Sequence, residues 1–201
     1  MKLKKFLEEH NIEAVLISSK YSLRYFTGFT GTTGIALAFA EKRFFFTDFR
    51  YVTQAKKEVE PNGFTVVKVE RGAVDALAEY IKNSGIKKLG IEDKYVTLAE
   101  YVVYKEKFEE IGFVTLGEAL DKLRMIKTEE DIGYIKKAVE IGDKVFEYIL
   151  DKVKEGAVEK DLAAEMEFQM KKLGGEGPSF ETIIASNYRS ALPHGVASEK
   201  K

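Results

Sequence analysis

Residues 35–47 read IALAFAEKRFFFT and contain two short apolar runs separated by the polar pair Glu41 and Lys42. Runs of this length, rich in apolar and aromatic residues, are typical of β-strands. A gap of two residues leaves room only for a tight turn, so the two strands must pair antiparallel. We therefore expect a β-hairpin formed by Ile35–Ala40 and Arg43–Thr47.

Short apolar runs alternate with helical periodicity on both sides of this hairpin. The run Ala14–Ile17 is continuously apolar, as expected for a strand buried on both faces. Thr97 and Glu100 form a capping box, which marks the start of a helix. This alternation predicts an α/β (α+β) fold over residues 1–122, with a mixed sheet flanked by helices. The other predicted elements are the strands Phe64–Val69, Leu89–Ile91 and Phe113–Leu116 and the helices Met1–His10, Tyr51–Val59 and Ala73–Asn83.

The pattern changes after Leu123. Apolar residues recur at helical spacing through residues 129–154, which predicts one long amphipathic helix. A second helix is predicted over Glu159–Leu173, and Phe180–Ala185 is a candidate strand. This organisation predicts two domains, residues 1–122 and residues 123–201, the second of them incomplete.

Composition limits the classes of protein to which the chain can belong. None of the 201 residues is Cys, which excludes disulfides and zinc–thiolate sites. The net charge is −1 with both signs interspersed, unlike a nucleic-acid-binding surface. The longest apolar runs fall far short of the ~20 residues that span a bilayer, and the N-terminal residues lack the apolar run of a signal peptide. We expect a cytoplasmic protein with no nucleic-acid or membrane partner.

The residues alone show none of the common catalytic motifs. A nucleophile elbow, a phosphate-binding loop and a His-Glu-x-x-His helix are all missing from the sequence. The glycines from Gly28 to Gly34 precede a strand rather than a helix, which favours a turn over a phosphate site. His10 and His194 are the two histidines, and without cysteine they do not make a recognisable metal site. The carboxylates follow solvent-facing helix surfaces.

Five short segments, spread over nearly the whole chain, carry a resemblance to a known family. They are Tyr21–Gly31, Phe46–Ala55, Leu123–Ile132, Glu159–Ala163 and Pro193–Gly195. In this order they are similar to motifs of the Xaa-Pro aminopeptidase and Xaa-Pro dipeptidase (prolidase) family. The longer stretch Gly177–Ser198 resembles the segment that leads into the metal centre of that family. The chain therefore resembles a creatinase-type N-terminal domain followed by the start of a pita-bread metallopeptidase domain.

The resemblance implies a metal-dependent, proline-specific exopeptidase that hydrolyses Xaa-Pro peptides or dipeptides. In this family two divalent metal ions (Mn, Co or Zn) activate a bridging hydroxide. The ligands of these metals come later in the chain, so they are expected beyond Lys201 and no metal is expected in this chain. The 201-residue chain alone is therefore expected to be inactive. A homodimer is expected, because family members commonly form one.

The resemblance also assigns roles to two residues. His194 is expected to be catalytic, lying beside the metals without binding them and donating a hydrogen bond to the substrate or to the tetrahedral intermediate. Phe180 is expected to line the pocket for the proline ring, which has no N–H and must be recognised by an apolar wall. Val158 departs from the family pattern, because a Thr or Ser usually caps the helix there, and the loss costs about 1 kcal/mol.

Two alternatives remain open. A creatinase-like relative shares both domains but hydrolyses its substrate without metal. A non-catalytic dimerisation or binding module would keep the N-terminal domain and lack the catalytic one. The residues that follow Lys201 in the native gene distinguish these readings. Five metal ligands favour the peptidase, their replacement favours the creatinase-like relative, and a true stop codon favours the non-catalytic module.

Overall fold

The computed structural model describes residues 3–70 and 72–201 and divides into two units, one ending at Ile126 and the other covering Lys127–Lys201. The helix α6 (Ala119–Met125) crosses the predicted domain boundary at residues 122–123. Its residue Leu120 is buried in the apolar core of the first unit. The division therefore falls four residues later than the predicted boundary, because α6 packs with the sheet domain.

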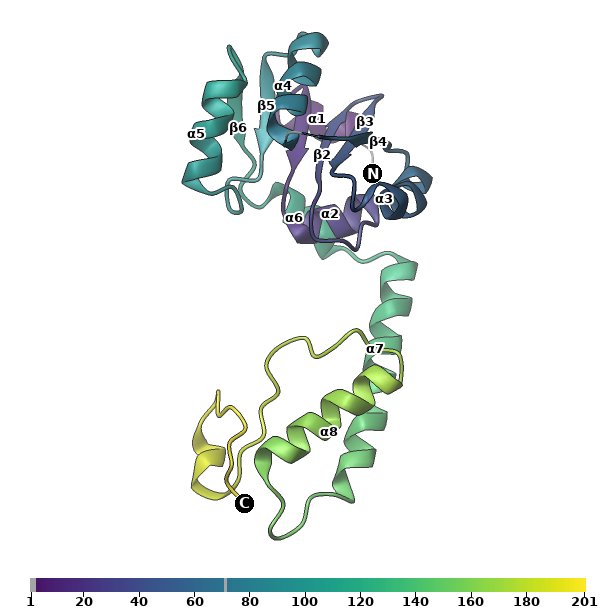
Figure 1. The fold of residues 1–201 in the computed structure, drawn as a ribbon, viewed down its shortest axis with the longest axis vertical. Coiled ribbons are helices and arrows are strands. Elements are labelled where there is room, and N and C mark those ends of the chain that lie inside the picture. Colours follow the sequence, from purple (N-terminus) through teal and green to yellow (C-terminus); the bar gives the residue numbers. More distant parts are fainter. Residues whose placement is uncertain (1–2, 71) are drawn as a thin grey trace. The chain divides into compact units, whose positions relative to one another are not determined.

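A six-stranded mixed sheet forms the centre of the first unit (Figure 1). Its strands are β1 (Ala14–Ile17), β2 (Ile35–Phe39), β3 (Arg43–Thr47), β4 (Thr65–Lys68), β5 (Lys88–Ile91) and β6 (Gly112–Thr115). Their order across the sheet is β4-β3-β2-β1-β5-β6. Strand β2 pairs antiparallel with both β1 and β3, and the other three pairs are parallel. The predicted hairpin is confirmed, with Ile35 opposite Phe46 and Ala38 opposite Arg43.

Helices pack against both faces of this sheet, as predicted. They are α1 (Leu3–Glu9), α2 (Lys20–Thr27), α3 (Val52–Val59), the 3-10 helix η1 (Glu60–Asn62), α4 (Ala73–Ser84), α5 (Leu98–Lys107) and α6. Val15 and Ile17 of β1 share a buried cluster with residues of α1 and α3. Ala14 and Leu16 share a second cluster with residues of α4 and α5. Because successive side chains of a strand point to opposite faces, a strand covered on both faces must be apolar throughout.

Helix starts in the first unit follow local side-chain chemistry. The capping box is confirmed, since Thr97 Oγ1 accepts a hydrogen bond from Glu100 N and the Glu100 carboxylate accepts one from Thr97 N at 2.8 Å. Helix α2, which the apolar pattern does not predict, begins at the N-cap Ser19. The predicted first helix begins at Leu3 within the described range, and Met1 and Lys2 lie outside the described residues.

The second unit contains two long helices and a folded C-terminal segment (Figure 1). They are α7 (Glu129–Leu150), α8 (Glu159–Lys172) and the 3-10 helix η2 (Asn187–Ala191). The predicted long helix is confirmed as unbroken, although it ends at Leu150 rather than at residue 154. Its residues Val139 and Phe146 remain 55% and 60% exposed, so much of its apolar face is uncovered. No helix in the described part of the chain has the length and apolar character needed to cross a bilayer.

Candidate active-site loop

The chain after α8 returns to the start of that helix and forms a loop of residues 186–198, which we call the His194 loop. It contains η2, and one isolated antiparallel bridge joins Ile183 to Val196 just before its end. The predicted strand Phe180–Ala185 is wrong, because only this one pair forms. The backbone of Ser198 cannot extend the pairing, since its N–H and its carbonyl are both bonded to the start of α8.

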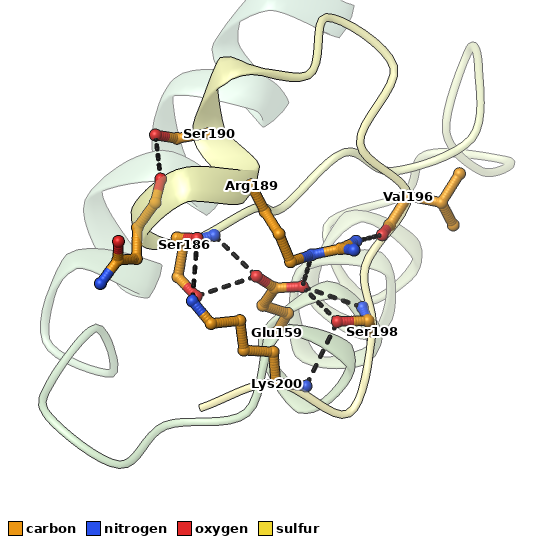
Figure 2. Close-up of polar contacts among 8 residues, drawn as sticks. Glu159, Ser186, Arg189, Ser190, Val196, Ser198 and Lys200 are labelled. Atoms are coloured by element: carbon orange, nitrogen blue, oxygen red, sulfur yellow. Dashed lines mark hydrogen bonds and ion pairs between the residues drawn. The ribbon is translucent and has the colours of Figure 1, made fainter.

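The carboxylate of Glu159, which belongs to α8, lies at the centre of the hydrogen bonds that hold the His194 loop (Figure 2). Glu159 is the first residue of α8, and its side chain is only 2% exposed. Its Oε1 accepts hydrogen bonds from Ser186 N at 2.6 Å and Ser186 Oγ at 2.9 Å. Its Oε2 accepts from Ser198 N at 3.1 Å, from Ser198 Oγ at 2.7 Å and from Arg189 Nε at 3.2 Å. One buried anion therefore binds both ends of the loop and its 3-10 helix.

The electrostatics of this cluster keep Glu159 ionised. Burial by itself raises the pKa of the carboxyl, because a low dielectric disfavours the charged form. Hydrogen bonds from Ser198 and Ser186 outweigh burial and lower the pKa from 4.5 to about 2. A carboxylate offers about four lone-pair sites, and the five donors around Glu159 occupy them. Glu159 is therefore suited to hold structure rather than to exchange protons.

Further bonds connect the cluster to the backbone of the loop (Figure 2). Arg189 donates from Nη2 to the carbonyl of Val196 at 2.6 Å, so its guanidinium bridges the carboxylate and the last residues of the loop. Lys200 donates from its backbone N to Ser198 Oγ at 3.2 Å and from Nζ to the carbonyl of Ser186 at 3.3 Å. The two serines are thus held on more than one side.

The start of α8 has no side-chain cap, as the sequence predicts for Val158. Its first amides are bonded by backbone carbonyls instead. The N–H of Glu159 donates to the carbonyl of Lys200 at 2.9 Å, and the N–H of Lys160 donates to the carbonyl of Ser198 at 3.1 Å. These bonds satisfy amides that have no partner within the helix, so much of the expected cost of losing the cap is avoided.

His194 and Phe180, the two residues expected to meet substrate, are both exposed. The side chain of Phe180 is 73% exposed. His194 lies between η2 and Val196, and its imidazole makes no hydrogen bond to any residue that the structure describes. The next residue, Gly195, is buried, and a Cβ there would lie 3.2 Å from Ala185 Cβ and 3.3 Å from the carbonyl of Leu192. The backbone is thus closely packed where the imidazole is open to solvent.

A groove of about 620 Å³ opens beside the start of α8. Its mainly apolar walls include Ile149, Val153, Leu162, Met166, Ile184 and the edge of Glu159. Neither His194 nor Phe180 lines it. This groove is therefore not a pocket shared by the two predicted substrate residues.

The described residues do not fit a pair of metal ions. Across residues 3–70 and 72–201, no three His, Asp or Glu side chains are grouped so that they could hold a metal. A two-metal site needs several carboxylate or imidazole ligands around ions ~3.5–4 Å apart. The best-placed carboxylate, that of Glu159, already binds five protein donors.

Glu159 is the candidate functional residue that sequence reasoning missed. Its position in the sequence could have pointed to it, because Glu159 directly follows the non-capping residue Val158 and begins one of the five segments of resemblance. A carboxylate is favoured at the first turn of a helix whether or not it binds anything else. Its partners Ser186 and Ser198 are far along the chain, so the local sequence could not show that they converge on it.

Comparison with known families gives two matches, in order along the chain. Residues 1–126 match the Creatinase/Prolidase N-terminal domain, and residues 133–201 match Metallopeptidase family M24. The first match ends where the first structural unit ends, and the second begins inside α7.

Individual relatives match both units. The chain is 38% identical over 204 residues to a Xaa-Pro dipeptidase of Pyrococcus furiosus. The matched region covers 100% of this chain and 56% of that protein. It is similar to the solved structure of a Xaa-Pro dipeptidase from Bacillus anthracis, with a TM-score of 0.91, 40% identity, and coverage of 99% of this chain and 55% of that one. The solved structure of an X-Pro aminopeptidase from Thermotoga maritima gives a TM-score of 0.89 and 36% identity. The match covers 98% of this chain and 56% of that one. The chain thus spans just over half the length of these relatives.

Proposed function

Because this chain belongs to the family of the Creatinase/Prolidase N-terminal domain and Metallopeptidase family M24, we propose that it is the N-terminal part of a metal-dependent hydrolase of Xaa-Pro bonds. One observation carries the proposal. Relatives named Xaa-Pro dipeptidase match both units at 38% and 40% identity, over 100% and 99% of the chain.

Within this proposal His194 donates a hydrogen bond to the substrate or to the tetrahedral intermediate, and Phe180 lines the proline pocket. The exposed imidazole on a closely packed backbone supports the first role, since a donor to substrate must have a free N–H and a fixed position. The exposed ring of Phe180 supports the second, since an apolar wall must be open to receive its ligand.

The metals and partners of the complete protein form the rest of the proposal. Two divalent ions (Mn, Co or Zn) bind to side chains outside this sequence, so the 201-residue chain alone has no peptidase activity. We place the enzyme in the cytoplasm, as a homodimer. The apolar face of α7 at Val139 and Phe146 is uncovered in this chain, which supports its association with a second copy or with a partner chain that carries the missing half of the second domain, because exposed apolar patches beyond a few hundred Å² mark interfaces. A monomer by light scattering at high concentration would contradict the dimer.

The proposal is tested with the complete protein and matched dipeptides, one ending in proline and the other in alanine. We expect hydrolysis that requires proline, is lost on metal removal, and returns with Mn²⁺, Co²⁺ or Zn²⁺. Hydrolysis that survives metal removal favours the creatinase-like alternative, and inactivity toward every peptide favours the binding module. Metal-dependent hydrolysis by the 201-residue chain alone would overturn the claim that it is inactive.

The role of His194 is tested by His194→Ala in the complete protein. We expect kcat to fall by about 10²-fold or more, the usual loss for a positioned transition-state donor, with metal content unchanged. The matched control is His10→Ala, since His10 is the other histidine and its Nδ1 bonds the carbonyl of Phe6 within the first unit. Unaltered turnover of His194→Ala, or loss of bound metal, would remove the assigned role.

A further inference from the structure

The His194 loop has few apolar contacts to hold it. Within the described part of the second unit, the buried apolar residues are Val145, Ile149 and Ala163, all of which lie on the helices. In the loop itself Tyr188 is 74% exposed and Leu192 is 51% exposed. Only one residue pair, Ile183 and Val196, gives it a β-bridge. Among residues 127–201, the position of the loop therefore depends mainly on polar contacts.

Those polar contacts converge on one side chain. Ser186 and Ser198, the two ends of the loop, bond opposite oxygens of the Glu159 carboxylate, and Arg189 bonds it from the 3-10 helix η2. A carboxylate that only complemented the dipole of α8 would need none of these partners. Charge-assisted hydrogen bonds are about twice as strong as neutral ones, and burial strengthens them further.

We propose that Glu159 is a positioning residue, whose buried carboxylate fixes both ends of the His194 loop and thereby fixes the imidazole of His194 for catalysis. We call the hydrogen bonds that join the Glu159 carboxylate to Ser186, Arg189 and Ser198 the clasp. The catalytic half of this inference rests on the proposed function, whereas the clasp does not. A reacting group displaced by about 1 Å can cost about 10²-fold in rate, so a loosened loop lowers turnover even though Glu159 never meets substrate.

Glu159→Gln is the variant that tests this inference, because it keeps the shape of the side chain. The carboxamide replaces one acceptor oxygen by an NH₂ group, which faces either the donors of Ser186 or those of Ser198. The chain supplies a matched control in Glu92→Gln. Glu92 is also buried, at 3% exposure, and accepts hydrogen bonds from Ser18 and Ser19, but it lies in the first unit.

The first measurement is amide hydrogen exchange on the complete protein. Glu159→Gln is expected to speed exchange at residues 186–198 by at least about tenfold, the effect of losing hydrogen bonds to a charged group. Glu92→Gln is expected to leave these residues unchanged. Exchange in the His194 loop that is the same in Glu159→Gln and in the unmutated protein overturns the clasp, whatever happens to turnover.

The second measurement is a double-mutant cycle on kcat. Glu159→Gln alone is expected to lower kcat by about 10-fold to 10²-fold with KM and metal content little changed. In a His194→Ala background it is expected to have no further effect, because the group it positions is gone. Additive losses, or an unchanged kcat in Glu159→Gln, overturn the positioning role. The control Glu92→Gln should combine additively with His194→Ala.

A milder variant covers the case in which Glu159→Gln does not fold. Ser198→Ala removes the 2.7 Å hydroxyl contact to Glu159, together with the 3.2 Å bond that Lys200 N donates to the same hydroxyl, and keeps the bond from Ser198 N to the carboxylate. A smaller loss of kcat that again disappears in His194→Ala supports the inference. An additive loss overturns it. If His194→Ala itself leaves turnover unaltered while loop exchange still rises in Glu159→Gln, the clasp stands and the proposed function of His194 fails.

Discussion

The two units each bury one glutamate against a pair of serines, and they differ in what surrounds it. Glu92 follows β5 and accepts hydrogen bonds from Ser18 N at 2.7 Å and Ser19 N at 2.9 Å, at the start of α2. Those elements also belong to the apolar core around the six-stranded sheet. Glu159 accepts hydrogen bonds from a loop that has no comparable core among residues 127–201.

A buried, hydrogen-bonded carboxylate therefore contributes differently to the local structure in the two units. Where buried apolar surface already fixes the neighbouring elements, a hydrogen-bonded carboxylate adds to an arrangement that is set by packing. Where the neighbouring segment is largely exposed, the carboxylate determines the arrangement. The first unit is therefore expected to be sensitive to core truncation, and the His194 loop to changes of charge.

The largest expected effect is at the core of the first unit. Phe45 is fully buried in the sheet, so Phe45→Ala should lower the free energy of unfolding by about 3–5 kcal/mol. The matched change Phe146→Ala, at a ring that is 60% exposed on α7, should cost far less. Urea unfolding followed by circular dichroism measures both. Similar losses at the two positions would break the comparison between the units.

The next effect is a pH dependence of the His194 loop that comes from Glu159. The pKa of Glu159 in the folded protein, about 2, lies below its ordinary value of 4.5, so the unfolded chain takes up more protons between these values. The stabilisation from Glu159 is complete above pH ~4.5 and is lost as the pH falls toward 2. Limited proteolysis of the His194 loop across this range measures it. Glu159→Gln should remove the dependence, and equal profiles for both proteins would contradict it.

A smaller effect is expected at the capping box of α5. Thr97→Val removes the hydroxyl that accepts the hydrogen bond of Glu100 N, and it should cost about 0.5–2 kcal/mol. Thermal unfolding of the variant gives the value. Thr97→Ser keeps the hydroxyl and serves as the control, so a loss of the same size in both variants would show that the cap is not the cause.

The smallest effect is expected at the uncapped start of α8. Val158→Thr introduces a capping hydroxyl, yet the amides of Glu159 and Lys160 already donate to the carbonyls of Lys200 and Ser198. The gain in the free energy of unfolding should therefore stay below the ~1 kcal/mol typical of a new cap. Thermal unfolding measures this as well. A full-sized gain would show that the returning C-terminal segment is a poor substitute for a cap.

Features that depend on neighbouring residues could be predicted from the sequence. The hairpin, the buried strand Ala14–Ile17, the capping box at Thr97 and the unbroken helix after Thr128 are all confirmed. The candidate strand Phe180–Ala185 failed because a strand needs a partner, and the partner backbone is bonded to α8 instead. Short helices such as α6 gave too few apolar repeats to be recognised.

The candidate site shows the same limit. His194 and Phe180 were found through resemblance, and their roles remain predictions. The cluster around Glu159 could not be predicted, because its members come from residues 159, 186, 189 and 198, and only folding brings them together. A pattern of single residues indicates a helix start, but it does not indicate which distant donors will bind there.

The position of β1 in the middle of the sheet has a consequence for the order of folding. Its neighbour β2 is close in sequence, whereas its other neighbour, β5, begins only at Lys88. During synthesis β1 therefore carries an open edge of apolar residues until β5 has emerged, and such an edge is a template for pairing with another chain. The β2–β3 hairpin can close early, because short loops form quickly, and the β1–β5 pairing must follow later. The most protected strand of the finished domain is thus the one that remains open to mispairing while the chain is being made.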